Sequence, residues 1–148
     1  YFAGQNITVK NANLTLFVEN CDISNTTTVQ SINVAAYKLL NNQFTEDGVT
    51  WVKYDGSNAW TNQGGDYDPT PISNKISITP AYNSNYVSLN LDTSTIQSWI
   101  NNPTDNKGLI LIADEEKNTI NSHFVDFASS NTGVAKYRPK LTVYYTLN

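Results

Sequence analysis

The feature that most restricts the fold of this chain is a series of short segments in which apolar and polar residues alternate. In the stretch 7–18, Leu14, Leu16 and Val18 fall on one face and the residues between them on the other, a period of two that is typical of a β-strand. Further strand-like segments occupy residues 29–40, 49–54, 75–79, 86–91, 121–128 and 140–147, and the apolar run 108–113 is also expected to be a strand. Some eight strands separated by turn residues predict an all-β, antiparallel sandwich of jelly-roll type.

One segment has a helical period instead. Asp92 or Thr93 can cap a helix, because a side-chain oxygen there accepts an otherwise unpaired backbone N–H. The apolar residues that follow are spaced at i, i+3 and i+4, and they are Ile96, Trp99 and Ile100. Asn102-Pro103 ends the helix, so one short helix is expected.

Two further expectations concern the core. The run Gly108 to Ala113 is continuously apolar, which predicts a strand buried in the centre of a sheet. Trp51, on the expected strand 49–54, and Trp99, on the apolar face of the helix, are expected in the core. The stretch 55–74 holds glycines and prolines and predicts one long loop, of a length that is usually functional or stabilised by a ligand.

The composition indicates one domain over residues 1–148 and excludes some partners. Asn, Thr and Ser account for 21, 17 and 12 of the 148 residues, and these types favour turns and half-exposed strands over helix interiors. A net charge of −4 argues against a nucleic-acid partner, which needs a basic face. No stretch is long and apolar enough for a membrane helix, so membrane insertion is not expected.

The beginning of the sequence and its sequons bear on the origin of the chain. The sequence starts at Tyr1 and contains no Met, which predicts a processed product or an excerpt of a longer chain. Cys21 is the only cysteine, so no internal disulfide is expected, and a lone cysteine does not decide the redox compartment. Three sequons, at Asn6, Asn13 and Asn25, are glycosylation candidates if the chain passes through a secretory route. Chance is the alternative explanation, since Asn and Thr are abundant.

The long loop carries the candidate binding residues. Asp55, Asp66 and Asp68 lie beside glycines, and carboxylates in a glycine-rich loop can bind calcium. The alternative is that these aspartates form hydrogen-bonded turns. Aromatic rings that stack on sugar are also candidates, and they are Trp60, Tyr67 and Tyr54. For Trp60 the alternative is packing beneath its own loop.

The lysines and the single histidine give weaker indications of a binding or catalytic function. Four lysines could face an acidic polysaccharide, although isolated surface lysines are the default interpretation; they are Lys38, Lys53, Lys75 and Lys107. His123 is the only histidine, and Ser122 and His123 would point to opposite faces of a strand. A catalytic triad and a zinc site are therefore not expected, and the chain is predicted not to be an enzyme.

Several motifs occur in an order that resembles one known family. They are Phe44-Thr-Glu-Asp-Gly-Val-Thr-Trp51, Asp55-Gly-Ser-Asn-Ala-Trp60, Gly64-Gly-Asp-Tyr-Asp68, Ile96-Gln-Ser-Trp-Ile100, Asn106-Lys-Gly-Leu-Ile-Leu and Arg138-Pro-Lys-Leu-Thr-Val-Tyr-Tyr. This set resembles the DNRLRE domain family, also called disaggregatase-related and grouped with carbohydrate-binding modules. The resemblance extends over nearly the whole chain, and it implies a jelly-roll sandwich in secreted, cell-surface or phage-structural proteins.

The resemblance also shows where this chain differs from the family domains, and it suggests what the chain does. Family domains begin with further strands upstream of the position that corresponds to Tyr1, so the chain is expected either to be the C-terminal portion of a larger domain or to be completed by strands from another polypeptide, and the second is the hypothesis adopted. The first functional hypothesis is a non-catalytic carbohydrate-binding or adhesive module on an extracellular, cell or virion surface. The alternatives are a structural subunit of a filament, sheath or virion completed by strand exchange, and an accessory fragment of a larger secreted enzyme.

Overall fold

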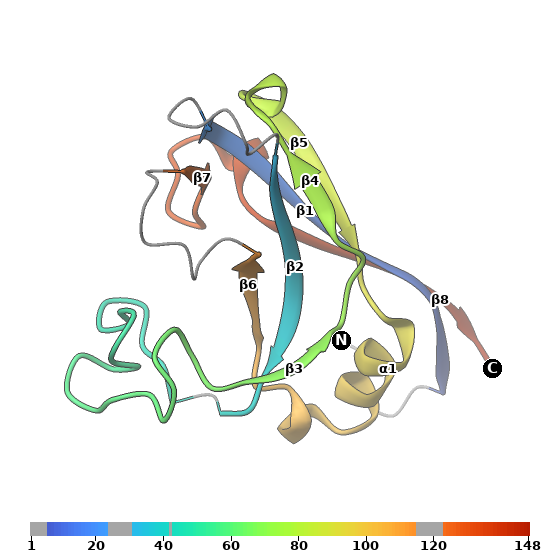
Figure 1. Ribbon diagram of the computed structural model, residues 1–148. Helices are drawn as coiled ribbons and strands as arrows, with labels where there is room; N and C mark the ends of the chain where they lie inside the picture. Colours follow the sequence, from blue (N-terminus) through green and yellow to red (C-terminus); the bar gives the residue numbers. More distant parts are fainter. Residues whose placement is uncertain (1–5, 24–30, 42, 115–122) are drawn as a thin grey trace.

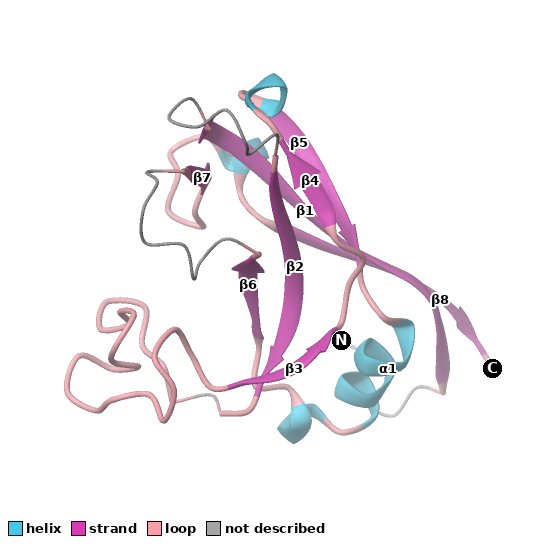
Figure 2. Cartoon of the chain, viewed as in Figure 1, coloured by secondary structure: helices cyan, strands magenta, loops and turns pink. Residues whose placement is uncertain are grey.

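The computed structural model is an all-β sandwich made of two antiparallel sheets (Figure 1). It describes residues 6–23, 31–41, 43–114 and 123–148. Eight strands and one α-helix account for most of the regular structure in these residues, with three single-turn 3-10 helices at Pro80–Tyr82, Pro103–Asp105 and Ala135–Tyr137 (Figure 2). The predicted fold class is therefore confirmed. No helix among these residues has the length and apolar character needed to cross a membrane.

The first sheet is built around one long strand, β1 (Ile7–Asp22). On one side β1 pairs with β5 (Asn85–Asn90); on the other it pairs with β8 (Lys140–Leu147) along its first half and with β7 (Phe124–Phe127) along its end. The register shifts between Val9 and Asn11 and between Val18 and Asn20. Such bulges bend and twist a strand, which lets β1 serve two successive neighbours.

The second sheet has β2 (Ile32–Leu39) at its centre. On one side β2 pairs with β6 (Leu109–Ala113). On the other side its two ends pair with β3 (Tyr67–Pro71) and β4 (Ile76–Ile78). This sheet is therefore only three strands wide at any point along β2.

The core lies between the two sheets and follows the alternation in the sequence. Leu14, Leu16 and Val18 of β1 are buried, and they face Val34 and Ala36 of β2 in one apolar cluster. At about 25 cal/mol per Å² of apolar surface, each of these larger side chains contributes roughly 1.5–3 kcal/mol. The period-two pattern therefore located the principal core correctly.

The helix α1 (Thr93–Asn101) closes one end of the sandwich. Asp92 caps it, because its carboxylate accepts the Thr95 N–H at 2.8 Å. Ile96 and Trp99 are buried, and Gln97 accepts the Val9 N–H of β1 through Oε1 at 2.8 Å. The predicted helix, its cap and the core position of Trp99 are confirmed.

The segment 49–54 is not a strand, and the expectation that Trp51 lies in the core is wrong. The segment forms bends with one isolated bridge, between Lys53 and Ala59. Its hydrogen bonds are local, such as the one from Thr50 N–H to Lys53 O at 2.7 Å. Because no strand pairs along it, the alternation has no sheet to orient it, and Trp51 is 53% exposed.

The boundaries of the expected loop also need correction. Residues 67–71, expected within a loop, form β3. This strand contains two prolines and lies at an edge of its sheet, where a missing N–H donor is tolerated. The long loop, defined here as residues 43–66, therefore begins after β2 and ends at β3.

The expectation that the segment 108–113 is a fully buried central strand is wrong as well. All five residues of β6 are half-buried, and β2 is its only partner strand among the described residues. Hydrogen bonds flank the pairing with β2 at both ends, from Leu39 N–H to Gly108 O and from Asp114 N–H to Asn33 O. In an antiparallel ladder, residue pairs that are hydrogen-bonded to each other alternate with pairs that are not. Leu109 and Leu111 belong to the second kind, so their N–H and C=O groups point away from β2, toward the edge of β6 that has no partner strand among the described residues.

Candidate functional site

The long loop is held in place by its own hydrogen bonds. Gly64 N–H donates to Trp51 O at 2.7 Å, and Trp60 N–H donates to Val52 O at 3.1 Å. The indole Nε1 of Trp60 donates to Thr50 O at 3.0 Å, and its ring packs edge-on against Tyr54. Trp60 is 8% exposed, so this tryptophan is the small apolar core of the loop.

Two aspartates brace the same loop. The carboxylate of Asp55 accepts the N–H groups of Ser57 and Asn58, and that of Asp66 accepts the N–H groups of Thr61 and Asn62. The hydrogen bond from the Asn58 backbone is the main cause that lowers the pKa of Asp55. Burial tends to raise the pKa of Asp66, but the donors at Thr61 and Asn62 lower it on balance. Both side chains favour the ionised form.

Asp68, the third predicted calcium ligand, belongs to β3. It accepts the Thr70 N–H at 3.0 Å and lies 3.7 Å from Lys38 Nζ. Within the described part of the chain, no three His, Cys, Asp or Glu side chains form a group that could hold a metal ion. The calcium site remains a prediction, and the three aspartates already have hydrogen-bonding roles in the loop and in β3.

Trp51 is the more exposed of the two exposed aromatic residues of the loop, at 53% against 41% for Phe44. Its ring lies against Gly64, whose φ of +89° suits a glycine. A Cβ atom added at Gly64 would lie 2.6 Å from Cη2 of Trp51. Because any larger residue would displace the ring, Gly64 provides the flat support on which the indole rests. The Trp51 side chain is thus held in place on one side and open to solvent on the other.

A groove of about 310 Å³ opens beside Trp51. We call it the aromatic groove, and it is lined by Tyr37, Trp51, Gln63, Gly64, Tyr67, Ile112, Ala113 and Asp114. Tyr37 comes from β2 and Tyr67 from the start of β3, with ring centroids 5.3 Å apart. Aromatic rings and a few polar groups that converge in one hollow are typical of a small-molecule site.

A second hollow shares Trp51 as a lining residue. This apolar hollow has a volume of about 250 Å³ and is lined by Val49, Thr50, Trp51, Trp60, Gly64, Ile110, Leu111 and Ile112. The long loop comes close to β6 here, since a Cβ atom at Gly65 would lie 2.9 Å from Cδ1 of Ile110. The outward side chains of β6 therefore form the floor under both hollows.

The charged groups at the aromatic groove are paired. Lys75 Nζ lies 2.8 Å from Oδ1 and 2.8 Å from Oδ2 of Asp114. Hydrogen bonding to Asp114 raises the pKa of Lys75. Of the other predicted surface lysines, Lys38 pairs with Asp68 and Lys53 donates to the backbone oxygen of Gly56.

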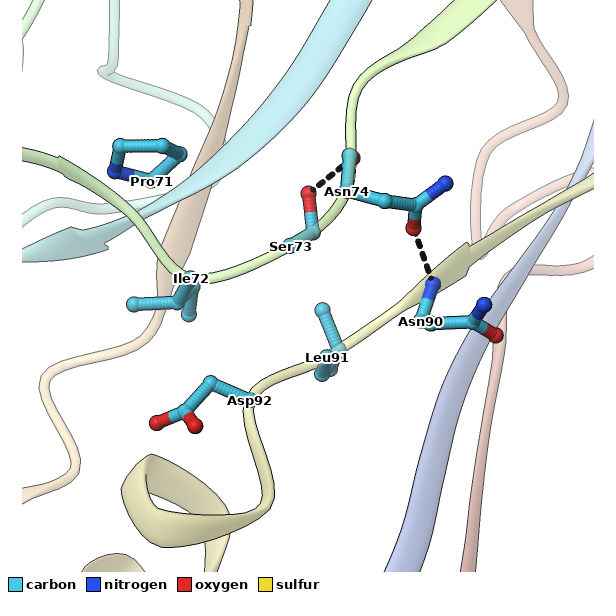
Figure 3. Close-up of a pocket in the computed structure, with 7 residues that line it drawn as sticks. All are labelled: Pro71, Ile72, Ser73, Asn74, Asn90, Leu91 and Asp92. Atoms are coloured by element: carbon cyan, nitrogen blue, oxygen red, sulfur yellow. Dashed lines mark hydrogen bonds between the residues drawn. The ribbon is translucent and has the colours of Figure 1, made fainter.

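A third hollow, of about 260 Å³, lies where the segment after β3 passes the end of β5 (Figure 3). Its polar groups are engaged with one another. Asn74 Oδ1 accepts the Asn90 N–H at 2.7 Å, and Ser73 Oγ donates to Asn74 O at 2.7 Å. Asp92, also on its wall, caps α1. These bonds join the two sheets and leave few groups for a ligand, so this hollow is structural.

The structure brings together only part of the predicted site. Tyr67 lines the aromatic groove, whereas Trp60 and Tyr54 pack on each other within the loop. Sequence reasoning missed Trp51, Tyr37, Gln63 and Asp114. For Tyr37 a signal existed, because the alternation of β2 places it on the face opposite the buried Val34 and Ala36. The sequence holds no comparable signal for Gln63 or Asp114.

The glycosylation and catalytic predictions stay predictions. Asn6 is exposed, Asn13 lies in the middle of β1, and Asn25 falls outside the described residues. Ser122 also falls outside them. His123 and Asp126 lie in and beside β7, away from the residues that line the aromatic groove.

Comparison with known proteins adds no identification. No family model matches the chain, no curated protein matches its sequence, and no solved structure matches its fold. The resemblance to DNRLRE domains therefore remains a prediction. Any functional proposal has to rest on the geometry of the site.

Proposed function

We propose that this chain is a non-catalytic carbohydrate-binding module of an extracellular, cell or particle surface. The observation that carries the proposal is the half-exposed indole of Trp51, held on Gly64 beside a groove that Tyr37 and Tyr67 also line. A pyranose ring has an apolar face that fits a flat aromatic side chain. The hydroxyls of the sugar can bond with Gln63 and Asp114 at the rim.

The rigidity of the platform supports this proposal. The loop is fixed by the Trp60 indole and by the carboxylates of Asp55 and Asp66 before any ligand arrives. A preorganised site avoids the entropic cost of ordering on binding. A groove whose one charged lining residue, Asp114, is paired with Lys75 suits recognition of a sugar surface without chemical change.

The test is a glycan array followed by titration calorimetry with the glycans that bind. Trp51→Ala is expected to weaken binding by at least tenfold, because it removes the stacking surface. Val52→Ala is the matched control, since Val52 is 43% exposed on the same loop and lines neither hollow. Equal affinity of the two variants would contradict the placement of the site.

A second candidate function is a structural subunit completed by strands from another polypeptide. Leu141, Tyr145 and Leu147 of β8 pair with Leu14, Val9 and Ile7 of β1, all buried. Paired residues share a face, so the three β8 side chains also point inward, yet they are 50%, 43% and 68% exposed. The sandwich therefore exposes apolar side chains along β8, and in the opposite sheet β6 has one edge without a partner strand among the described residues.

The mass of the native material distinguishes the two candidates. Light scattering with intact mass spectrometry on native material would give a monomer for an independent binding module. A co-purifying polypeptide or a large assembly would instead favour completion by added strands, which exposed strand edges invite.

A further inference from the structure

Trp51 lines two hollows rather than one. The aromatic groove and the apolar hollow share three wall residues, Trp51, Gly64 and Ile112. Their volumes, about 310 and 250 Å³, lie at or below the lower limit of drug-sized pockets. Each hollow therefore suits one small ring, and a longer ligand has to cross the indole to use both.

The two hollows differ in chemistry. The aromatic groove offers hydrogen-bonding groups from Gln63, Tyr67 and Asp114. The apolar hollow offers side chains from Val49, Trp60 and Ile110, and the Nε1 donor of Trp60 is already bonded to Thr50 O. A ligand that spans them needs hydroxyls on one side of the indole and an apolar ring face on the other.

The charges nearby provide no anion site. Lys75 is paired with Asp114 by two contacts of 2.8 Å, and Lys38 is paired with Asp68. The residues that line the two hollows include no lysine or arginine, and Asp114 is their one charged member. A uronate carboxylate would find no lysine or arginine among these lining residues, and the cation nearest to Asp114 is already paired with it.

We infer that the ligand is an uncharged oligosaccharide chain that crosses Trp51, with one sugar unit in each hollow. This inference rests on the proposed carbohydrate-binding function. The unit in the aromatic groove bonds through its hydroxyls. The unit in the apolar hollow packs its ring face on Val49 and Ile110. Affinity therefore depends on chain length and little on ionic strength.

The experiment is titration calorimetry of the chain with neutral gluco-, manno- and xylo-oligosaccharides of one to six units. Oligogalacturonates of the same lengths serve as charged counterparts, and each series is measured at low and high salt. For at least one neutral series, affinity should rise about tenfold or more from one unit to two or three, and should then level off. High salt should leave that affinity within about twofold, because screening acts on charges.

A variant isolates the apolar hollow. Val49→Phe fills part of it without altering Trp51 or the aromatic groove. We expect this variant to bind the single sugar unit as the parent does and to lose the gain from the second unit. Val52→Phe is the control, because this equally exposed valine lines neither hollow. Thermal denaturation of both variants checks that the loop remains folded.

The possible outcomes separate this inference from the function on which it rests. Tighter binding of oligogalacturonates that weakens with salt would keep the carbohydrate function and overturn the uncharged ligand. Affinity independent of chain length, or Val49→Phe indistinguishable from Val52→Phe, would overturn the crossing of Trp51. Failure of every saccharide to bind would overturn both the inference and the proposed function.

Discussion

At the scale of single residues, two tryptophans of one loop have opposite roles. Trp60 is buried and donates its indole N–H to the backbone, whereas Trp51 is half-exposed on Gly64. The sequence predicted the reverse assignment for Trp51, and for Trp60 it left open sugar stacking or packing beneath its own loop, of which the structure shows the packing. Burial depends on what the rest of the loop covers, and the residue type does not encode it.

This contrast predicts opposite effects on stability and binding. Trp60→Ala should lower the free energy of unfolding by roughly 3–5 kcal/mol, because it removes a buried aromatic side chain. Trp51→Ala should change it by about 1 kcal/mol or less, as surface substitutions do. Urea denaturation followed by circular dichroism measures both. A larger loss for Trp51→Ala than for Trp60→Ala would contradict the assignment.

Asp92 gives a prediction on pH dependence. Hydrogen bonds from the side chains of Ser94 and Thr95, and from the Thr95 N–H, hold its pKa at about 2, below the usual 3.8. The folded state therefore favours the ionised carboxylate. The stabilisation is present above about pH 4 and is lost as the pH falls through about 2.

The measurement compares the parent chain with Asp92→Asn, which keeps a capping oxygen but does not titrate. We expect the parent to be more stable by roughly 0.5–1 kcal/mol near neutral pH. This difference should shrink toward zero as urea denaturation is repeated down to about pH 2. A difference that stays constant over this range would show that the charge of Asp92 makes no contribution.

At the scale of elements, the long loop is a folded unit despite its lack of regular secondary structure. Its backbone bonds, the Trp60 core and the two aspartate braces connect β2 to β3 and set Trp51 over β6. The sequence indicated an unusual loop but extended it to residue 74. Its true end is set by pairing of β3 with β2, a contact between distant segments.

Gly64→Ala tests the support that this element gives to Trp51. The added methyl would meet Cη2 at 2.6 Å, and the φ of +89° is unfavourable for alanine. The indole should therefore be displaced, with a shift in tryptophan fluorescence and loss of saccharide binding. Gly133→Ala is the control, because nothing lies within 4 Å of its added methyl. Unchanged binding by Gly64→Ala would show that the ring does not need this support.

At the scale of the whole molecule, the sandwich is closed along one side and open along the other. The segment between β3 and β4 is joined to the segment after β5 by an isolated bridge between Ser73 and Leu91, which ties the two sheets together. On the other side, β6 and β8 carry inward-facing apolar residues that are half-exposed or exposed. Open apolar surface on a sheet margin favours association.

This open side predicts association that charge would suppress. A double variant, Leu141→Lys with Leu147→Lys, should lower self-association or partner capture, because two exposed apolar side chains become charged. The unfolding free energy should change by about 1 kcal/mol or less, since both side chains are at least half-exposed. Sedimentation velocity at several concentrations measures the first effect. Association unchanged by the double variant would place the contact elsewhere.

The sequence by itself determined the strands of the core, the capped helix and the all-β class. Alternation fixes which side chains share a face, and a cap such as Asp92 acts within one turn of its helix. The tertiary structure alone decided that β6 is an edge strand, that Trp51 is exposed and that Tyr37, Tyr67 and Asp114 line one groove. These outcomes depend on which segment, distant in the sequence, packs on a given face of a strand or loop. A local pattern of residues does not specify that segment.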